Sequence, residues 1–292
     1  MYNTIRVLMK RIRVFSSFCD SNNCKEVYER LCQTHLLDYY GKDLIFTSGD
    51  DYTHVVIMNI AMPTLNVPRE NVIGIAFEPP QFLNLTMEFI QYASKHIGVY
   101  FIGDTRLDVG QGRIFNLPAP FVPHFGFMWH CTTSEADKAR TTPRAKLMSL
   151  MVSDKGYAPG HKLRHELVKR ILASNLPIDI YGRGCALYNS SDSRLKGTFS
   201  EIEPYEGYKY HIAIENFETE AYFSEKLMNP LLCGTIPIYN GCRTADAYFP
   251  NSIIRIDGYD ADRAFNTIRG ICSKQPEYEL DSCRIKKNGK FS

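Results

Sequence analysis

Acidic and basic residues gather between two apolar runs in the segment HIAIENFETEAYFSEKLMNPLLCGTIPIYNG, residues 211–241. Both runs are typical of buried strands, and Ser224 is a favourable N-cap for a helix that begins at Glu225. The start of a helix offers free N–H groups and the positive end of the helix dipole. Lys226 adds a positive charge in the first turn, where a cation is unfavourable for the helix itself. The combination suits a bound anion such as a diphosphate; a solvated first turn with an incidental lysine is the alternative.

A second candidate is Glu78, in the segment IAFEPPQF (75–82). A buried strand is expected to end at Phe77, which leaves Glu78 at its carboxyl end. The two prolines that follow stop the strand and stiffen the turn, and this fixes the direction of the carboxylate. A general base must be held within hydrogen-bond reach of the proton that it removes. Glu78 therefore suits general-base catalysis, and the alternative is a carboxylate that simply begins a loop.

Two further patterns suit an anion or a metal ion. Arg164 follows a flexible loop with Gly and Pro residues that leads from a strand into a helix, and its guanidinium fork suits phosphate oxygens. The alternative for this arginine is a plain solvated charge on a helix. Asp260 and Asp262 form a D-x-D pair, a pattern that can bind a divalent metal, but they precede a helical run and helix capping is the simpler interpretation.

Composition limits the class of protein. The 292 residues are 44% hydrophobic and 23% charged, and the net charge of +2 gives no indication of a nucleic-acid partner. The nine cysteines include no C-x-x-C pair, which argues against structural zinc and a disulfide framework and favours a reducing compartment. Charged residues interrupt the N-terminal apolar run, and no run is long enough for a membrane span. We therefore expect a soluble, cytoplasmic protein with no signal peptide or transmembrane segment.

Short apolar runs alternate with helical patterns along the chain, which predicts parallel sheets with helices on both faces. The polar stretch 130–146 is typical of a linker or an exposed loop. We predict two Rossmann-like, doubly wound α/β domains that face a central cleft. The N-terminal domain is expected at 1–135 and the C-terminal domain at 136–275, followed by a tail at 276–292.

The C-terminal half resembles the α1,3/4-fucosyltransferases of glycosyltransferase family ten. Their signature is Phe-Glu-Asn, then Tyr-x-Thr-Glu-Lys, an apolar helix, Gly-Thr-x-Pro-Val and a Gly. This chain has IENFETEAYFSEKLMNPLLCGTIPIYNG, with Ser224 in place of Thr and Ile214 in place of Phe. IDIYGRGC (178–185) and YFPNSIIRID (248–257) resemble two further segments of the family, and AFEPP resembles the segment that carries its catalytic base.

The resemblance implies a GT-B fold that moves fucose from GDP-fucose to a hydroxyl of an acceptor glycan with inversion, in an α1,3 linkage to GlcNAc or Glc. It implies an acceptor-binding N-terminal domain with Glu78 as the base, and a donor-binding C-terminal domain. There Arg164 and Lys226 neutralise the diphosphate and Glu225 holds the ribose. The other implied donor-binding residues are Tyr181, Gly182, Glu215, Asn216 and Tyr222. No cofactor is implied, and a divalent metal is not expected to be essential, because Lys, Arg and the helix dipole supply the countercharge.

Two alternatives keep part of this interpretation: the same fold with another nucleotide-sugar donor, and an inactive module that binds a nucleotide sugar or a glycan. A binding module needs no base, so Glu78 argues against the second. Because a cation is unfavourable in a first turn, we also expect that removing Lys226 weakens GDP binding and changes stability little. The acceptor surface is expected in segments 61–70 and 104–128. Aromatic residues that could stack on sugars there, or pack between the domains, are Phe121, His124, Phe125, Phe127 and Trp129.

Overall fold

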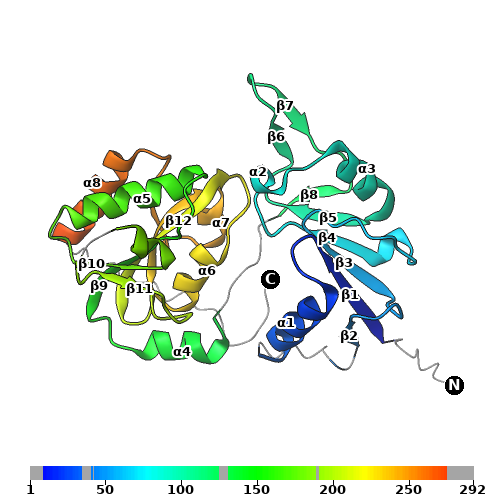
Figure 1. The fold of residues 1–292 in the computed structure, drawn as a ribbon, viewed down its shortest axis with the longest axis horizontal. Helices are drawn as coiled ribbons and strands as arrows, with labels where there is room; N and C mark the ends of the chain where they lie inside the picture. The colour runs from blue at the N-terminus through cyan, green and yellow to red at the C-terminus, as the bar shows by residue number, and fades with distance from the viewer. Residues whose placement is uncertain (1–8, 35–40, 42, 125–130, 189–190, 275–292) are drawn as a thin grey trace. The chain divides into compact units, whose positions relative to one another are not determined.

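The computed structural model describes residues 9–34, 41, 43–124, 131–188 and 191–274 (Figure 1). The chain divides into two compact units, Met1–Phe127 and Met128–Ser292, a short way before the boundary expected at residue 135. Each unit contains a six-stranded parallel sheet, so the predicted pair of doubly wound α/β domains is confirmed. The expected tail, 276–292, lies outside the described residues. Within the part of the chain that is described, no helix is both long enough and apolar enough to cross a membrane.

All neighbouring strands of the sheet in the first unit run parallel. The order of its strands is β2 (Leu44–Thr47), β1 (Lys10–Ser16), β3 (His54–Met58), β4 (Val72–Ile75), β5 (Val99–Ile102) and β8 (Phe121–Pro123). The direction of winding reverses between β1 and β3. Ligands of doubly wound sheets bind beyond the carboxyl ends of the strands at such a switch point.

Helices cover both faces of this sheet, as Figure 1 shows. Met58 of β3 belongs to the apolar cluster on the side of α1 (Ser21–Thr34), whereas Ile57 belongs to the cluster on the side of α3 (Met87–His96). Neighbouring residues of β3 thus face opposite helices, as the two-residue period of a strand requires. The remaining described elements are α2 (Pro80–Leu83), a 3-10 turn (Arg69–Asn71) and the antiparallel hairpin of β6 (Arg106–Asp108) and β7 (Ile114–Asn116).

The sheet of the second unit is also fully parallel. The order of its strands is β11 (Leu195–Gly197), β10 (Ile178–Tyr181), β9 (Lys146–Met151), β12 (Tyr208–Thr219), β13 (Ile236–Cys242) and β14 (Ile254–Arg255). Its switch point lies between β9 and β12. The segments that follow these two strands are therefore the first place to look for a ligand site.

Each face of this second sheet has its own helices. On one face α5 (Pro159–Leu172) and α8 (Ala261–Lys274) lie side by side, and their apolar residues share one core with the sheet (Figure 1). On the other face α4 (Thr133–Thr141) and α6 (Glu225–Leu232) are joined by a hydrogen bond and a shared apolar cluster. The remaining described elements are α7 (Ala245–Tyr248) and a 3-10 turn (Arg183–Leu187).

The prediction of a linker or exposed loop over 130–146 is wrong for the residues that form α4. Thr132 and Glu135 form a reciprocal capping box: Oγ1 of Thr132 accepts from the Glu135 N–H at 3.2 Å, and the Glu135 carboxylate accepts from the Thr132 N–H at 2.7 Å. Ala136 and Ala139 are buried in the cluster that the helix shares with α6. Two small residues thus anchor the helix, and a search for large apolar residues misses them.

Candidate active site

The start of α5 meets the carboxyl end of β12 through Arg164. Its guanidinium donates one hydrogen bond to the carbonyl oxygen of Ile214 and a second, of 2.9 Å, to Oδ1 of Asn216. Arg164 is buried, with 5% of its surface exposed. The structure therefore brings two of the predicted donor residues into direct contact, one from a helix and one from the end of the strand at the switch point.

This contact depends on Gly160, in the first turn of α5. A Cβ atom at this position would lie 1.8 Å from the carbonyl oxygen of Glu215. A larger residue would push the start of α5 away from β12 and carry Arg164, one turn further along, with it. The sequence predicts that a flexible loop with Gly and Pro residues leads into a helix here, and the structure shows that Gly160 packs the start of this helix against β12.

Glu215 fixes the start of α6. Its carboxylate accepts hydrogen bonds from the N–H and the Oγ–H of Ser224, at 2.8 Å and 2.7 Å. Oγ of Ser224 in turn accepts from the Lys226 N–H at 3.3 Å, so the predicted N-cap is confirmed. Tyr222, also buried, donates its N–H to Oγ1 of Thr219 at 3.1 Å and shapes the turn before the cap. Glu215, predicted as a donor contact, is thus turned toward the first turn of α6.

Lys226 lies between two carboxylates. Its Nζ is 2.8 Å from Oε1 of Glu225 and 3.7 Å from Oε2 of Glu215. The Glu215 side chain is 1% exposed and that of Lys226 is 22% exposed. We therefore revise the expectation that Lys226 adds little stability, because its removal would leave a buried carboxylate without its nearest cation.

Burial shifts the pKa values of these groups. It raises the pKa of Glu215, against the opposing effect of Lys226. It lowers the pKa of Arg164 to about 10, although Glu215 and Glu225 act in the opposite direction. Burial also favours a lower pKa for Lys226, but Glu225 and Glu215 outweigh it and the net shift is upward. Both cations therefore stay charged at neutral pH, and the two carboxylates make their burial possible.

His161 is a residue of this cluster that sequence reasoning missed. It is 3% exposed, its Nδ1 accepts from the Ala158 N–H at 3.3 Å, and its ring packs edge-on against Tyr157 with centroids 4.9 Å apart. Burial, together with the positive charges of Arg164 and Lys226, lowers the pKa of His161 to about 4, so the ring is neutral at pH 7. Its position three residues before Arg164, on the same helix face, was an available signal.

Tyr181 and Gly182, at the end of β10, do not join the hydrogen-bonded cluster around Arg164. The Tyr181 hydroxyl is buried and lies 2.8 Å from the hydroxyl of Tyr208. Gly182 has a φ of 110°, and a Cβ atom there would lie 2.2 Å from the carbonyl oxygen of Val152. Glycine is therefore required at this position, because only a residue without a Cβ lets the end of β10 approach the backbone of Val152 this closely.

Glu78, the predicted base, lies in the first unit. The strand β4 ends at Ile75, two residues earlier than expected, and Glu78 follows in an irregular segment that leads into α2. The residue is exposed, while Pro79 and Pro80 on its C-terminal side are buried. The prolines thus anchor this segment to the unit and leave the glutamate accessible to solvent.

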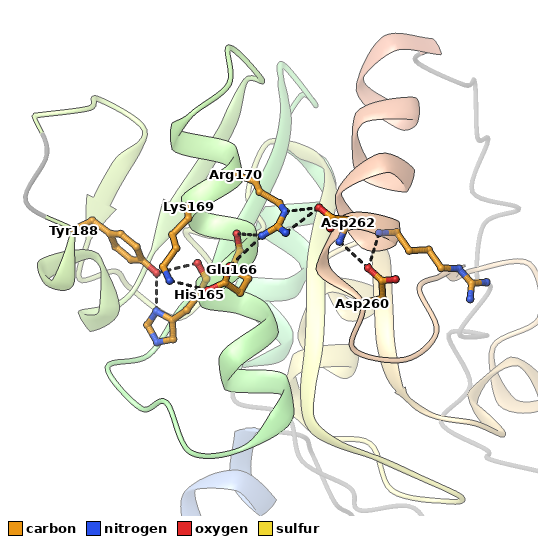
Figure 2. Close-up of polar contacts among 8 residues, drawn as sticks. His165, Glu166, Lys169, Arg170, Tyr188, Asp260 and Asp262 are labelled. Atoms are coloured by element: carbon orange, nitrogen blue, oxygen red, sulfur yellow. Dashed lines mark hydrogen bonds and ion pairs between the residues drawn. The ribbon is translucent and has the colours of Figure 1, made fainter.

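The D-x-D pair caps a helix and holds an ion pair, as Figure 2 shows. Oδ1 of Asp260 accepts from the N–H groups of Asp262 and Arg263, at 2.9 Å and 3.1 Å. Asp262 accepts from Arg170 of α5 at 2.9 Å. The capping interpretation is confirmed for Asp260. Among the residues that the structure describes, no group of three or more His, Cys, Asp or Glu side chains could hold a metal ion.

Comparison with known proteins identifies the domain that carries the Arg164–Lys226 cluster. Residues 141–279 match the model of the family described as glycosyltransferase family 10 (fucosyltransferase), C-terminal part. This part of the second unit, just under half of the chain, therefore resembles a glycosyltransferase family 10 domain. Two similar relatives are alpha-(1,3)-fucosyltransferase B of Drosophila melanogaster, 35% identical over 95 residues, and a fucosyltransferase-like protein of Arabidopsis thaliana, 29% identical over 89 residues. Each alignment covers 30% of this chain but only 21% and 16% of those two proteins.

The fold extends the similarity beyond residues 141–279. A crystal structure of an α1,3-fucosyltransferase with GDP-fucose matches with a TM-score of 0.55 and 15% identity, over 94% of this chain and 81% of that one. A crystal structure of an α1,3-fucosyltransferase with GDP matches with a TM-score of 0.54 and 14% identity, over 97% and 83%. At this identity the matches show the fold, and the predicted GT-B class is confirmed.

Of the five aromatic residues expected at an acceptor surface, the structure describes Phe121 and His124. Phe121 is 6% exposed in the core of the first unit, where its ring centroid lies 4.9 Å from that of Tyr100, so neither sugar stacking nor packing between domains describes it. The His124 ring lies 4.9 Å from the ring of Phe101. Phe125, Phe127 and Trp129 lie outside the described residues.

Proposed function

We propose that this protein is an inverting fucosyltransferase, which transfers fucose from GDP-fucose to a hydroxyl group of an acceptor glycan. The observation that carries the proposal is the meeting of Arg164, Asn216 and Lys226 at the switch point of a family 10 domain. The α1,3 linkage, to GlcNAc or Glc, is proposed by analogy with the similar proteins named as α1,3-fucosyltransferases.

The donor diphosphate is proposed to bind where α5 and α6 begin. Arg164 and Lys226 supply two positive charges, and the start of α6 adds the positive end of its helix dipole. Glu225, on the first turn of α6, is proposed to accept hydrogen bonds from the ribose hydroxyls. Asn216 and Tyr222 both precede this turn in the sequence and are proposed donor contacts, with Tyr181 and Gly182 nearer the guanosine. Glu215 is proposed to act beneath the donor by holding Ser224 and Lys226.

In the proposed reaction the acceptor oxygen attacks the anomeric carbon of fucose while the bond to the β-phosphate oxygen breaks. The acceptor proton passes to the Glu78 carboxylate, and GDP leaves with the bonding electron pair. A single displacement of this kind inverts the anomeric centre. Arg164 and Lys226 stabilise the charge that develops on the departing diphosphate, and we propose that this electrostatic stabilisation makes a divalent metal inessential.

The donor is tested by thermal shift with GDP, GDP-fucose, GDP-mannose and a set of UDP- and CMP-sugars. We expect GDP and GDP-fucose to raise the melting temperature; a rise with UDP- or CMP-sugars alone would refute the donor. The base is tested by Glu78→Gln, which keeps the size of the side chain but cannot take the proton. We expect turnover to fall by about 10²–10⁴-fold with nearly unchanged affinity for GDP-fucose, because the proposed donor contacts lie in the other unit. Normal turnover in this variant would remove Glu78 as the base.

A further inference from the structure

Asn59 occupies a special position in the first unit. It directly follows β3, one of the two strands at the switch point of the sheet. Its φ of 54° places it in the left-handed region, and its side chain is buried, with 6% exposed. Asparagine tolerates this conformation better than most residues. A buried polar residue in the left-handed region is nevertheless uncommon and indicates a structural or functional role.

The hydrogen bonds of Asn59 tie β3 to the segment that precedes Glu78. Its side-chain Oδ1 accepts from the Phe77 N–H at 2.9 Å. Its own N–H donates to the carbonyl oxygen of Ile75, the last residue of β4, also at 2.9 Å. Asn59 therefore forms hydrogen bonds with Ile75 and Phe77, the two ends of the short segment that leads to Glu78. The regular pairing of β3 with β4 has already ended at Met58 and Ile75.

A hydrogen bond from Tyr100 holds the backbone of Asn59. The Tyr100 hydroxyl donates to the carbonyl oxygen of Asn59 at 2.6 Å, and Tyr100 is fully buried. Its ring lies against Gly74, where a Cβ atom would come within 2.0 Å of it, and packs edge-on to Phe89 at 5.5 Å between centroids. Two hydrogen bonds, from Tyr100 to Asn59 and from Phe77 to Asn59, therefore connect the core of the unit to the backbone next to Glu78.

We propose that Asn59 is a positioning residue that aims the Glu78 carboxylate, an inference that rests on the function proposed above. The Phe77 amide fixes the backbone on the N-terminal side of Glu78, and Pro79, with a φ of −62°, fixes it on the other side. These two constraints fix the backbone from which the Glu78 side chain extends. A misplacement of a catalytic group by about 1 Å can cost about 10²-fold in rate.

Two substitutions separate the hydrogen bond from the unusual backbone conformation. Asn59→Gly accepts a positive φ without cost but removes the acceptor of the Phe77 N–H. Asn59→Asp keeps an oxygen in the same place. We expect Asn59→Gly to lower kcat by about 10–100-fold, with the affinity for GDP-fucose and its KM unchanged, and Asn59→Asp to retain most of the turnover. Hydrogen exchange of the Phe77 amide should be faster in Asn59→Gly than in the parent.

Ile57→Val serves as the stability control, since Ile57 is fully buried in the same strand and touches none of these hydrogen bonds. A loss of kcat in Ile57→Val equal to that in Asn59→Gly, at a similar drop in melting temperature, would overturn the proposal. Parent-like kcat in Asn59→Gly, when Glu78→Gln is inactive, would also overturn it and leave the proposed function intact. Full turnover in Glu78→Gln would refute the base itself, and this inference with it.

Discussion

Replacement of Lys226 by Met is expected to destabilise the second unit. Methionine retains the apolar stem but leaves the 1% exposed Glu215 without the ammonium group 3.7 Å away. Breaking a buried ion pair in this way costs about 3–5 kcal/mol. Lys226 is 22% exposed, and Ser224 keeps its two hydrogen bonds to Glu215, so the expected cost is reduced below this range, to about 2–3 kcal/mol.

Thermal unfolding followed by circular dichroism measures this cost. For a unit of this size the melting temperature should fall by roughly 4–12 °C. A second change, Glu215→Gln, removes the stranded charge while one oxygen still accepts from Ser224, so the double variant should recover most of the loss. An unchanged melting temperature in Lys226→Met, or a double variant no more stable than the single one, would refute the assignment of Lys226 as the counter-ion of Glu215.

The pH dependence has a defined sign. Burial raises the pKa of Glu215 in the folded protein, and loss of Lys226 removes an influence that lowers it. Between its ordinary pKa and this raised value, Glu215 binds a proton more tightly in the folded state, so stability rises as the pH falls through the folded pKa. The deficit of Lys226→Met relative to the parent should therefore be larger at pH 8 than at pH 5.5. A deficit that grows on acidification contradicts the argument.

Three further outcomes are expected. Gly160→Ala should lower both the melting temperature and the affinity for GDP, because the new Cβ would lie 1.8 Å from the Glu215 carbonyl oxygen, whereas Gly156→Ala, with nothing within 4 Å, should match the parent in both. Fucose transfer should persist in EDTA; complete loss of turnover, restored by manganese, would contradict the proposed role of Arg164 and Lys226. Asp262→Asn should change the melting temperature little and keep turnover within about twofold of the parent, because this 81% exposed carboxylate forms only a surface ion pair with Arg170.

The alternation of strands and helices was predictable because both sheets are parallel and buried on both faces. Their strands, such as β9 and β12, consist of short apolar runs that stand out from the amphipathic helices between them. The helix α4 was not predictable in this way, since its buried side is made of alanines and its polar residues are typical of a loop. Local capping signals were reliable: Ser224 and Asp260 both cap the helices that follow them.

The types of the candidate site residues could be predicted, but their partners could not. Sequence spacing placed Glu225 and Lys226 at a helix start, yet it gave no reason to expect that Glu215, nine residues before Ser224, would turn back to the cap. Asn59 was missed for the same reason. It owes its importance to Phe77, a neighbour brought close by the fold, and no local pattern records such a contact.

The burial of Arg164 and Lys226 has a consequence for how a charged donor would be captured. Charges on the surface act over a Debye length, about 8 Å at physiological ionic strength, and are weakened by salt. Arg164 is 5% exposed and is flanked by carboxylates, and the whole chain carries a net charge of only +2. A donor that binds as proposed is therefore not drawn in by a long-range field. The donor contacts Arg164 and Lys226 only after it loses its hydration water at the site. The affinity for the donor should therefore hardly depend on ionic strength.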